Sequence, residues 1–351
     1  MNLSKEANLL LRLYTPAIAG VFVAIFVFSA ILPLFKANAL TVTPKVELNA
    51  DPGTTLRISI KLTNEERQSR TFYLRYENFN SQDESGTPSF TTRKEGLSTW
   101  IKSQDSITLG PGETVDVPVD INVPKEAEPG GHFAAAFFSL EPPEPTPDKG
   151  AVAIGTRLGT LILLRVNGDF IQNATILEFN TAGKKKIFTQ LPIQFYYRFQ
   201  NTGDDHQKPL GDIQITNIFG RTIKLLSANT IDGSVLPKSI RRFTSVWTEQ
   251  GGSLKQEPVV DLVEAPKLPF WPTVKQQWNN FTFGRYTANL KVVYGTKELK
   301  STHSEVTFYI IPWQLLSVAV PTGLVLLILL RFGLKRYNKY IIAKAAKSKK
   351  T

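Results

Sequence analysis

The sequence predicts an all-β protein with two tandem immunoglobulin-like β-sandwich domains, an N-terminal signal helix and a C-terminal transmembrane helix. Apolar and polar residues alternate along most of residues 40–310, which is the period of a half-buried strand. Uncharged apolar runs lie near both ends of the chain. Of the net charge of +11, +2 falls in residues 1–39 and +8 in the last 21 residues, so the middle is nearly neutral.

The composition excludes several classes of protein. Because the middle of the chain is nearly neutral, the electrostatic case for a nucleic-acid partner disappears, and the basic ends indicate membrane topology instead. The chain contains no cysteine, which excludes thiol catalysis, cysteine-ligated zinc and a disulfide scaffold. This composition fits an exported protein of a monoderm bacterial envelope.

Residues 1–39 have the pattern of a signal peptide. Lys5 and Arg12 supply a positive start, and the apolar run 17–32 follows. Residues 37–39, Ala-Asn-Ala, match the small-x-small pattern that a signal peptidase cleaves. The apolar run is slightly long, which leaves an uncleaved anchor open. The residues that follow are exported in either case.

Residues 40–168 predict the first sandwich. Residues 56–62, 71–76 and 115–123 alternate, with Leu56, Ile58, Ile60 and Leu62 expected on one core face. Pro118 suggests an edge strand. Pro-Gly pairs at 52–53 and 111–112 predict type II turns directly before two of these strands. Residues 132–140 and 151–166 supply the remaining strands, and the Pro-rich stretch 141–150 between them is interpreted as an exposed loop. A β-barrel is the alternative architecture.

Residues 169–310 predict the second sandwich. Residues 192–201 alternate and end in Asn-Thr-Gly. Residues 211–217 and 221–226 predict a hairpin about Phe219-Gly220, and residues 283–312 close the domain with two or three strands. These last strands run almost directly into the transmembrane segment, so the domain is expected to stand on the bilayer surface.

The segment 247–281 has no clear strand period and carries several aromatic side chains. Loops of this length are uncommon and often functional. We predict that it packs near the membrane-proximal end of the second domain and contacts lipid or a partner, because rings and cations both gain free energy at an interface. The alternatives are sugar stacking at the distal end and a purely structural cover. The candidate contact residues are Phe270, Trp271, Trp278, Lys267 and Lys275.

Residues 311–331 predict one transmembrane helix, and residues 332–351 a basic cytoplasmic tail. The uncharged run 313–330 is long enough to cross the hydrocarbon core. Trp313 is expected at one interface, and Arg331, Lys335 and Arg336 at the other, on the cytoplasmic side. The protein is thus expected to be a single-pass plasma-membrane protein with its bulk outside the cell.

No catalytic or metal-binding motif is visible in the sequence. The three histidines are widely separated, and nucleophile-elbow, zincin, Walker and dinucleotide motifs are absent. Asp204, Asp205 and Asp212 could offer hard oxygen ligands to calcium, but they lack the spacing of a calcium loop.

Two stretches carry a family resemblance: TVTPKVELNADPGTTLRISIKLTN and ITLGPGETVDVPVDINVPKEAEPGGHFAAAFFS. In the second stretch, a strand is followed in order by Val-Pro, a short acidic turn, Pro-Gly-Gly and a strand of small residues. With the order of the whole chain, this pattern resembles the WxL-interacting proteins of Gram-positive bacteria. The resemblance implies a peptidoglycan-binding domain followed by a domain that binds another surface protein.

We therefore expect a membrane-anchored, non-enzymatic protein, without a cofactor, that binds peptidoglycan or another cell-wall glycan, or another envelope protein. One alternative is an assembly chaperone or signalling subunit, because sandwich edge strands can pair with a partner strand. The other is an exported polysaccharide-acting enzyme, supported only by scattered carboxylates at Glu141, Glu144, Asp204 and Asp205.

Overall fold

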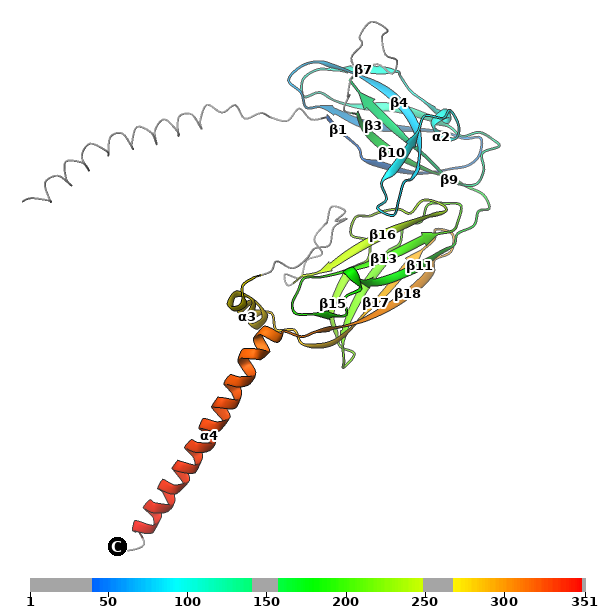
Figure 1. The fold of residues 1–351 in the computed structure, drawn as a ribbon. Coiled ribbons are helices and arrows are strands. Elements are labelled where there is room, and N and C mark those ends of the chain that lie inside the picture. Colours follow the sequence, from blue (N-terminus) through cyan, green and yellow to red (C-terminus); the bar gives the residue numbers. More distant parts are fainter. Residues whose placement is uncertain (1–39, 141–156, 249–267, 349–351) are drawn as a thin grey trace, which may run out of the picture.

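The computed structural model describes residues 40–140, 157–248 and 268–348 (Figure 1). The signal segment, the Pro-rich loop with Glu141 and Glu144, and Lys267 lie outside the described residues. The described strands form four sheets. Residues 40–166 form two of these sheets, which we call the N-terminal sheet pair. Residues 174–310 form the other two, which we call the C-terminal sheet pair.

The N-terminal sheet pair consists of sheets A and B. Sheet A has the order β1-β3-β8-β6, and sheet B the order β2-β10-β9-β4-β5, with β7 also paired to β4. The elements are β1 (Leu40–Val42), β2 (Lys45–Ala50), β3 (Thr55–Asn64), β4 (Arg70–Ser81), β5 (Pro88–Thr91), the short helix α2 (Leu97–Trp100), β6 (Ile101–Lys102), β7 (Ser106–Leu109), β8 (Thr114–Asn122), β9 (Gly130–Ser139) and β10 (Arg157–Val166).

The predicted register of the first alternating strand is confirmed. In β3, Ile60 and Leu62 are fully buried, and Leu56 and Ile58 are partly buried against the same core. Both predicted Pro-Gly turns also form. Gly53 and Gly112 have φ of 79° and 69°, the left-handed value that a type II turn needs at its third residue.

The predicted edge strand at Pro118 is confirmed for the part of β8 that contains it. Strand β8 pairs with β3 over residues 114–122 on one side. On its other side, within the described residues, it pairs only with the two residues of β6 at Ile121 and Asp120. The backbone around Pro118 therefore has a partner strand on one side only.

The C-terminal sheet pair consists of sheet C, with the order β11-β13-β16, and sheet D, with the order β12-β18-β17-β14-β15. Its elements are β11 (Ala174–Thr181), the 3-10 turn η1 (Ala182–Lys184), β12 (Ile187–Phe188), β13 (Ile193–Asn201), β14 (Leu210–Asn217), β15 (Thr222–Ser227), β16 (Ser239–Trp247), β17 (Gly284–Tyr294) and β18 (Lys300–Ile310). The predicted hairpin about Phe219-Gly220 is the β14–β15 pair.

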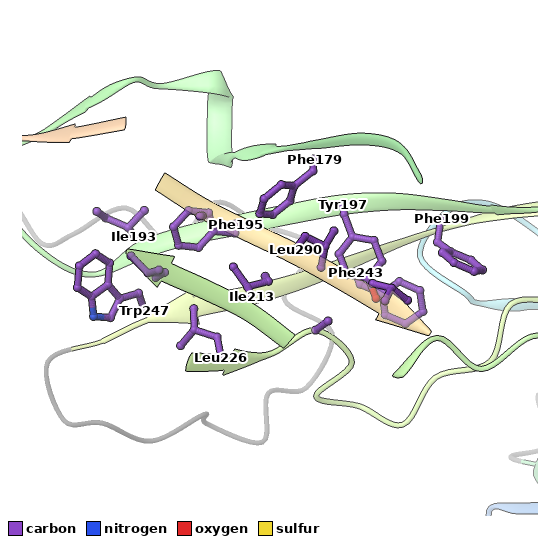
Figure 2. Packing of buried hydrophobic residues seen from close by; sticks show 14 of the residues in the cluster. Phe179, Ile193, Phe195, Tyr197, Phe199, Ile213, Leu226, Phe243, Trp247 and Leu290 are labelled. Carbon is purple, nitrogen blue, oxygen red and sulfur yellow. The ribbon is translucent and has the colours of Figure 1, made fainter. Parts of the chain in front are cut away.

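An aromatic core fills the space between sheets C and D. Figure 2 shows side chains of β11, β13 and β16 meeting Ile213 of β14 and Leu290 of β17. The rings of Tyr197 and Phe243 stack with their centroids 5.1 Å apart. The predicted boundary at residues 168–169 falls between the two sheet pairs. That each pair folds as an independent domain stays a prediction.

The segment expected to be an irregular loop contains a helix, α3 (Phe270–Asn279). Pro272 is tolerated there because it lies in the first turn, where a backbone N–H has no partner within the helix. The Thr273 hydroxyl donates to the Pro269 carbonyl at 2.9 Å and fastens that turn.

Helix α4 (Trp313–Ser348) follows β18 after two residues (Figure 1). It is longer than the predicted 311–331, because the basic residues that follow the apolar run also favour a helix. Its stretch 313–341 is long and apolar enough to cross a membrane, and the most apolar window of 18 residues in it has a mean hydropathy of 2.2. Arg331, Lys335 and Arg336 all lie on this helix.

Candidate functional site

The β4–β5 hairpin reaches from the N-terminal sheet pair onto β13 and β16 of the other pair. At its tip, the Glu84 carboxylate accepts hydrogen bonds from Arg198 Nε at 2.8 Å and Nη2 at 2.5 Å. The Glu84 carbonyl accepts a third from the Arg242 backbone N–H at 2.7 Å. Arg198 holds the pKa of Glu84 below its ordinary value. This contact fixes the hairpin against the outer face of sheet C.

A second contact between the sheet pairs is a buried ion pair. Asp205, which is fully buried, accepts a hydrogen bond from Arg165 Nε of β10 and lies 2.8 Å from His206 Nδ1. Beside it, the Gly131 N–H donates to the Asp204 carbonyl at 3.0 Å. With the Glu84 contact, this pair joins the two sheet pairs at separate points.

A cleft of about 340 Å³ lies between these sheet pairs. Its apolar lining includes Phe79, Leu161 and Leu163 from the outward face of sheet B, and Leu236 from the loop before β16. Charged side chains line it as well. Lys45 pairs with Glu47 at 2.7 Å and with Asp232, which also lines the cleft, at 3.7 Å. Arg241 of β16 also lines the cleft but forms no ion pair within the described residues.

Arg241 is the unusual group of the cleft. Its Nη1 donates to the Ser234 carbonyl at 2.8 Å, but its Nε is buried and has no hydrogen-bond partner in the described part of the chain. Burial lowers the pKa of its guanidinium, which nevertheless remains charged at neutral pH. A Cβ on Gly86 would lie 2.3 Å from Arg241 Cζ, so only glycine lets the hairpin pack this closely on the guanidinium.

The strand that carries Arg241 explains its burial. Residues alternate along β16, so Arg241, Phe243 and Trp247 point to the same side, into the sandwich, and the guanidinium lies 5.5 Å from the centre of the Phe243 ring. Neighbouring Arg242 points outward and stacks over Tyr196 at 4.0 Å. A charged residue on the apolar face of a strand was the one sequence signal for this site, and the sequence analysis missed it.

The sequence-predicted contact residues lie elsewhere, at the other end of the C-terminal sheet pair. Phe270, Trp271, Lys275 and Trp278 are all on α3, beside the beginning of α4. The Phe270 ring lies 6.3 Å from that of Trp313, and Trp271 and Trp278 are exposed. The structure thus brings these residues together with Trp313 but not with the cleft.

Of the carboxylates proposed for catalysis or calcium, Asp204 and Asp205 form other contacts. Asp204 pairs with Lys238 at 3.0 Å, and Asp205 with Arg165. Asp212 lies within β14 and forms no cluster with Asp204 and Asp205. Within the described residues no three acidic, histidine or cysteine side chains are grouped as a metal site would need.

Comparisons with known proteins give no family. No family model and no curated protein matches the chain. Among solved structures, the chain is similar to the class 5 fimbriae chaperone CfaA, with 8% identity and a TM-score of 0.35, covering 78% of this chain and 100% of that one. It is also similar to the E. coli chaperone DraB, with 10% identity, a TM-score of 0.32 and coverage of 77% and 97%. A PapD-like domain of human CEP192 matches at 14% identity and a TM-score of 0.27, covering 40% of this chain and 94% of that domain. At such scores these similarities assign no function.

Proposed function

We propose that this chain is a membrane-anchored, non-enzymatic protein that binds another envelope protein outside the cytoplasm. In this proposal the cleft between the sheet pairs receives an acidic side chain flanked by apolar residues. The observation that carries the proposal is the guanidinium of Arg241, which is largely buried at the cleft and has no carboxylate partner among the residues that the structure describes.

The free energy of an unpaired buried charge favours the binding of a carboxylate at Arg241. Burying a charged group without an ionic partner is costly, so such groups are normally paired. A guanidinium offers a planar set of donors that matches a carboxylate, and charge-assisted hydrogen bonds are about twice as strong as neutral ones. A ligand carboxylate that binds the guanidinium from the cleft would supply the ionic partner that Arg241 lacks among the described residues.

The rest of the cleft favours a polypeptide as the ligand. Leu161 and Leu236, which are partly buried, offer apolar surface beside the guanidinium, and the buried Phe79 and Leu163 complete the apolar lining. A ligand side chain that is fully buried there would contribute roughly 1.5–3 kcal/mol to the free energy of binding. A volume of about 340 Å³ lies at the lower end of the range of ligand pockets. Apolar and acidic side chains occur together in a peptide segment, whereas a neutral cell-wall sugar has no carboxylate to pair with Arg241.

The test compares matched peptides on full-length protein in nanodiscs. One peptide carries glutamate between two leucines, the other glutamine at that position, and fluorescence anisotropy measures binding. We expect only the glutamate peptide to bind. Arg241→Met should weaken it at least tenfold, because truncating one partner of a buried charge pair costs 2–5 kcal/mol or more.

Arg242→Met is the matched control, because Arg242 is the adjacent arginine but points away from the cleft. It should bind the glutamate peptide like the unaltered protein. Equal binding of both peptides, or full binding by Arg241→Met, would refute the proposal. Retention on purified cell walls that is unchanged by Arg241→Met would favour the glycan-binding alternative instead.

A further inference from the structure

The end of sheet D from which α4 leaves is defined by strand register. Strand β18 ends at Ile310, opposite Gly284 at the start of β17. Strand β14 ends at Asn217, opposite Tyr286 of β17. The β14–β15 turn at residues 218–221, the segment 280–283 and the beginning of α4 therefore share one end of the sheet.

Large apolar side chains are exposed at this end. The exposed fraction is 84% for Phe219, 70% for Trp278, 68% for Trp271, 64% for Ile218, 61% for Phe281 and 55% for Phe283. We call these six residues the aromatic rim. Scattered exposed apolar residues need no explanation, but a group gathered at one end of a molecule marks an interaction surface.

The fold itself does not require the exposed side chains of the β14–β15 turn. Asn217 builds this turn, since its Oδ1 accepts from the backbone N–H groups of Phe219 and Arg221, each at 3.0 Å. Gly220 supplies the positive φ of 73°. Phe219 contributes only its backbone to this geometry, so its large apolar side chain remains available for a contact beyond the described residues.

The charge of the described residues at this end is mostly positive, although Lys184 pairs with Glu178 at 2.8 Å. The sequence segments 182–190, 213–224 and 268–288 meet there and contain no aspartate or glutamate. Their cations are Lys184, Lys185, Lys186, Arg221, Lys224, Lys275 and Arg285. Rings with neighbouring cations are the combination that a membrane interface with anionic lipid attracts.

We propose that the aromatic rim rests in the lipid headgroup region and holds the C-terminal sheet pair against the bilayer. The bilayer is the expected occupant because only Ile311 and Pro312 separate β18 from α4, which can itself span the membrane. The C-terminal sheet pair therefore has no spacer that could lift this end away from the headgroups. The β14–β15 turn and α3 then supply separate contacts beside the point of insertion.

The absence of cysteine allows a direct test with single-cysteine variants. Phe219→Cys and Trp278→Cys would carry an environment-sensitive fluorophore in full-length protein, at one copy per nanodisc. Leu210→Cys is the control, because Leu210 is similarly exposed, at 57%, but begins β14 at the opposite end of the strand. We expect blue-shifted emission and quenching by headgroup-proximal spin-labelled lipid at positions 219 and 278, and neither effect at 210.

Equal emission and quenching at positions 219 and 210 would overturn the proposal. Shielding of position 219 that appears only when several copies share one disc would overturn it in favour of self-association. A second variant, Phe219→Asp with Phe281→Asp, should leave folding unchanged, because both side chains are exposed. It should abolish quenching of a fluorophore at position 278, and retained quenching would contradict the role assigned to the turn.

Discussion

At the scale of single residues, Ile60 shows most directly how the alternating pattern of a strand determines stability. It is fully buried in β3, whereas neighbouring Ser59 is exposed on the opposite face of the strand. Ile60→Asp should lower the free energy of unfolding of the N-terminal sheet pair by roughly 3–5 kcal/mol, because it removes core packing and buries an unpaired charge. Thermal or urea unfolding measures the change. Ser59→Asp should change it by less than about 0.5 kcal/mol, and equal effects would mean that the register is wrong.

Arg241 shows which features of the cleft follow from the alternation of residues along a strand and which do not. Alternation along β16 places residues 241, 243, 245 and 247 on one face of the strand, but this strand was not among those predicted from the sequence. The pattern does not reveal that the β4–β5 hairpin, far away in sequence, closes over the guanidinium through Gly86. Glu84 and Arg198 were likewise out of reach, because no local rule pairs residues 114 positions apart.

At the scale of elements, most strands and both Pro-Gly turns were predictable, because period and turn chemistry are local properties. Helix α3 was not predicted. Its ten residues include Pro272 and carry only a short apolar stripe, so the helix depends on tertiary packing against α4. The length of α4 was underestimated because charge, rather than helical propensity, was used to place its end.

Gln277 of α3 links that helix to the start of α4. This buried side chain donates through Nε2 to Gln314 Oε1 at 2.7 Å, and its Oε1 accepts from the Leu315 backbone N–H at 2.9 Å. Leu315 lies in the first turn of α4, where N–H groups lack partners within the helix. Gln277 therefore acts as a cap from outside the helix.

Replacing Gln277 should loosen this junction. Gln277→Leu leaves the Leu315 N–H without its acceptor, which costs about 1–3 kcal/mol for a buried group. Hydrogen exchange at residues 313–316 should accelerate accordingly. Asn279→Ala, an exposed substitution on the same helix, is the control. Unchanged exchange in Gln277→Leu would show that α3 does not order the start of α4.

At the scale of the whole molecule, the contact between the sheet pairs should depend on pH through Glu84. Arg198 lowers the pKa of the folded Glu84 carboxyl below its ordinary 4.5. The stabilisation is therefore complete above about pH 4.5 and is lost as the pH falls through the lower, folded value. Because both side chains are partly exposed, the effect should be at most about 1 kcal/mol.

Hydrogen exchange of the hairpin 83–87 measures this dependence. We expect protection to decrease as the pH falls below 4.5, after correction for the intrinsic exchange rate. Glu84→Gln should show the low protection at every pH, because its neutral amide cannot form the ion pair. An acid dependence that persists in Glu84→Gln would assign the effect to another group.

The central proposal concerns the molecule as a whole, namely that both sheet pairs lie outside the cytoplasm and the basic end of α4 lies inside. Because the chain contains no cysteine, single substitutions report topology without background. Ser301→Cys, exposed at the start of β18, and Ser348→Cys, at the end of α4, would each be treated with a membrane-impermeant maleimide on intact cells. The account predicts labelling at position 301 on intact cells and at position 348 only after permeabilisation. Labelling at 348 on intact cells, or protection of 301, would contradict it.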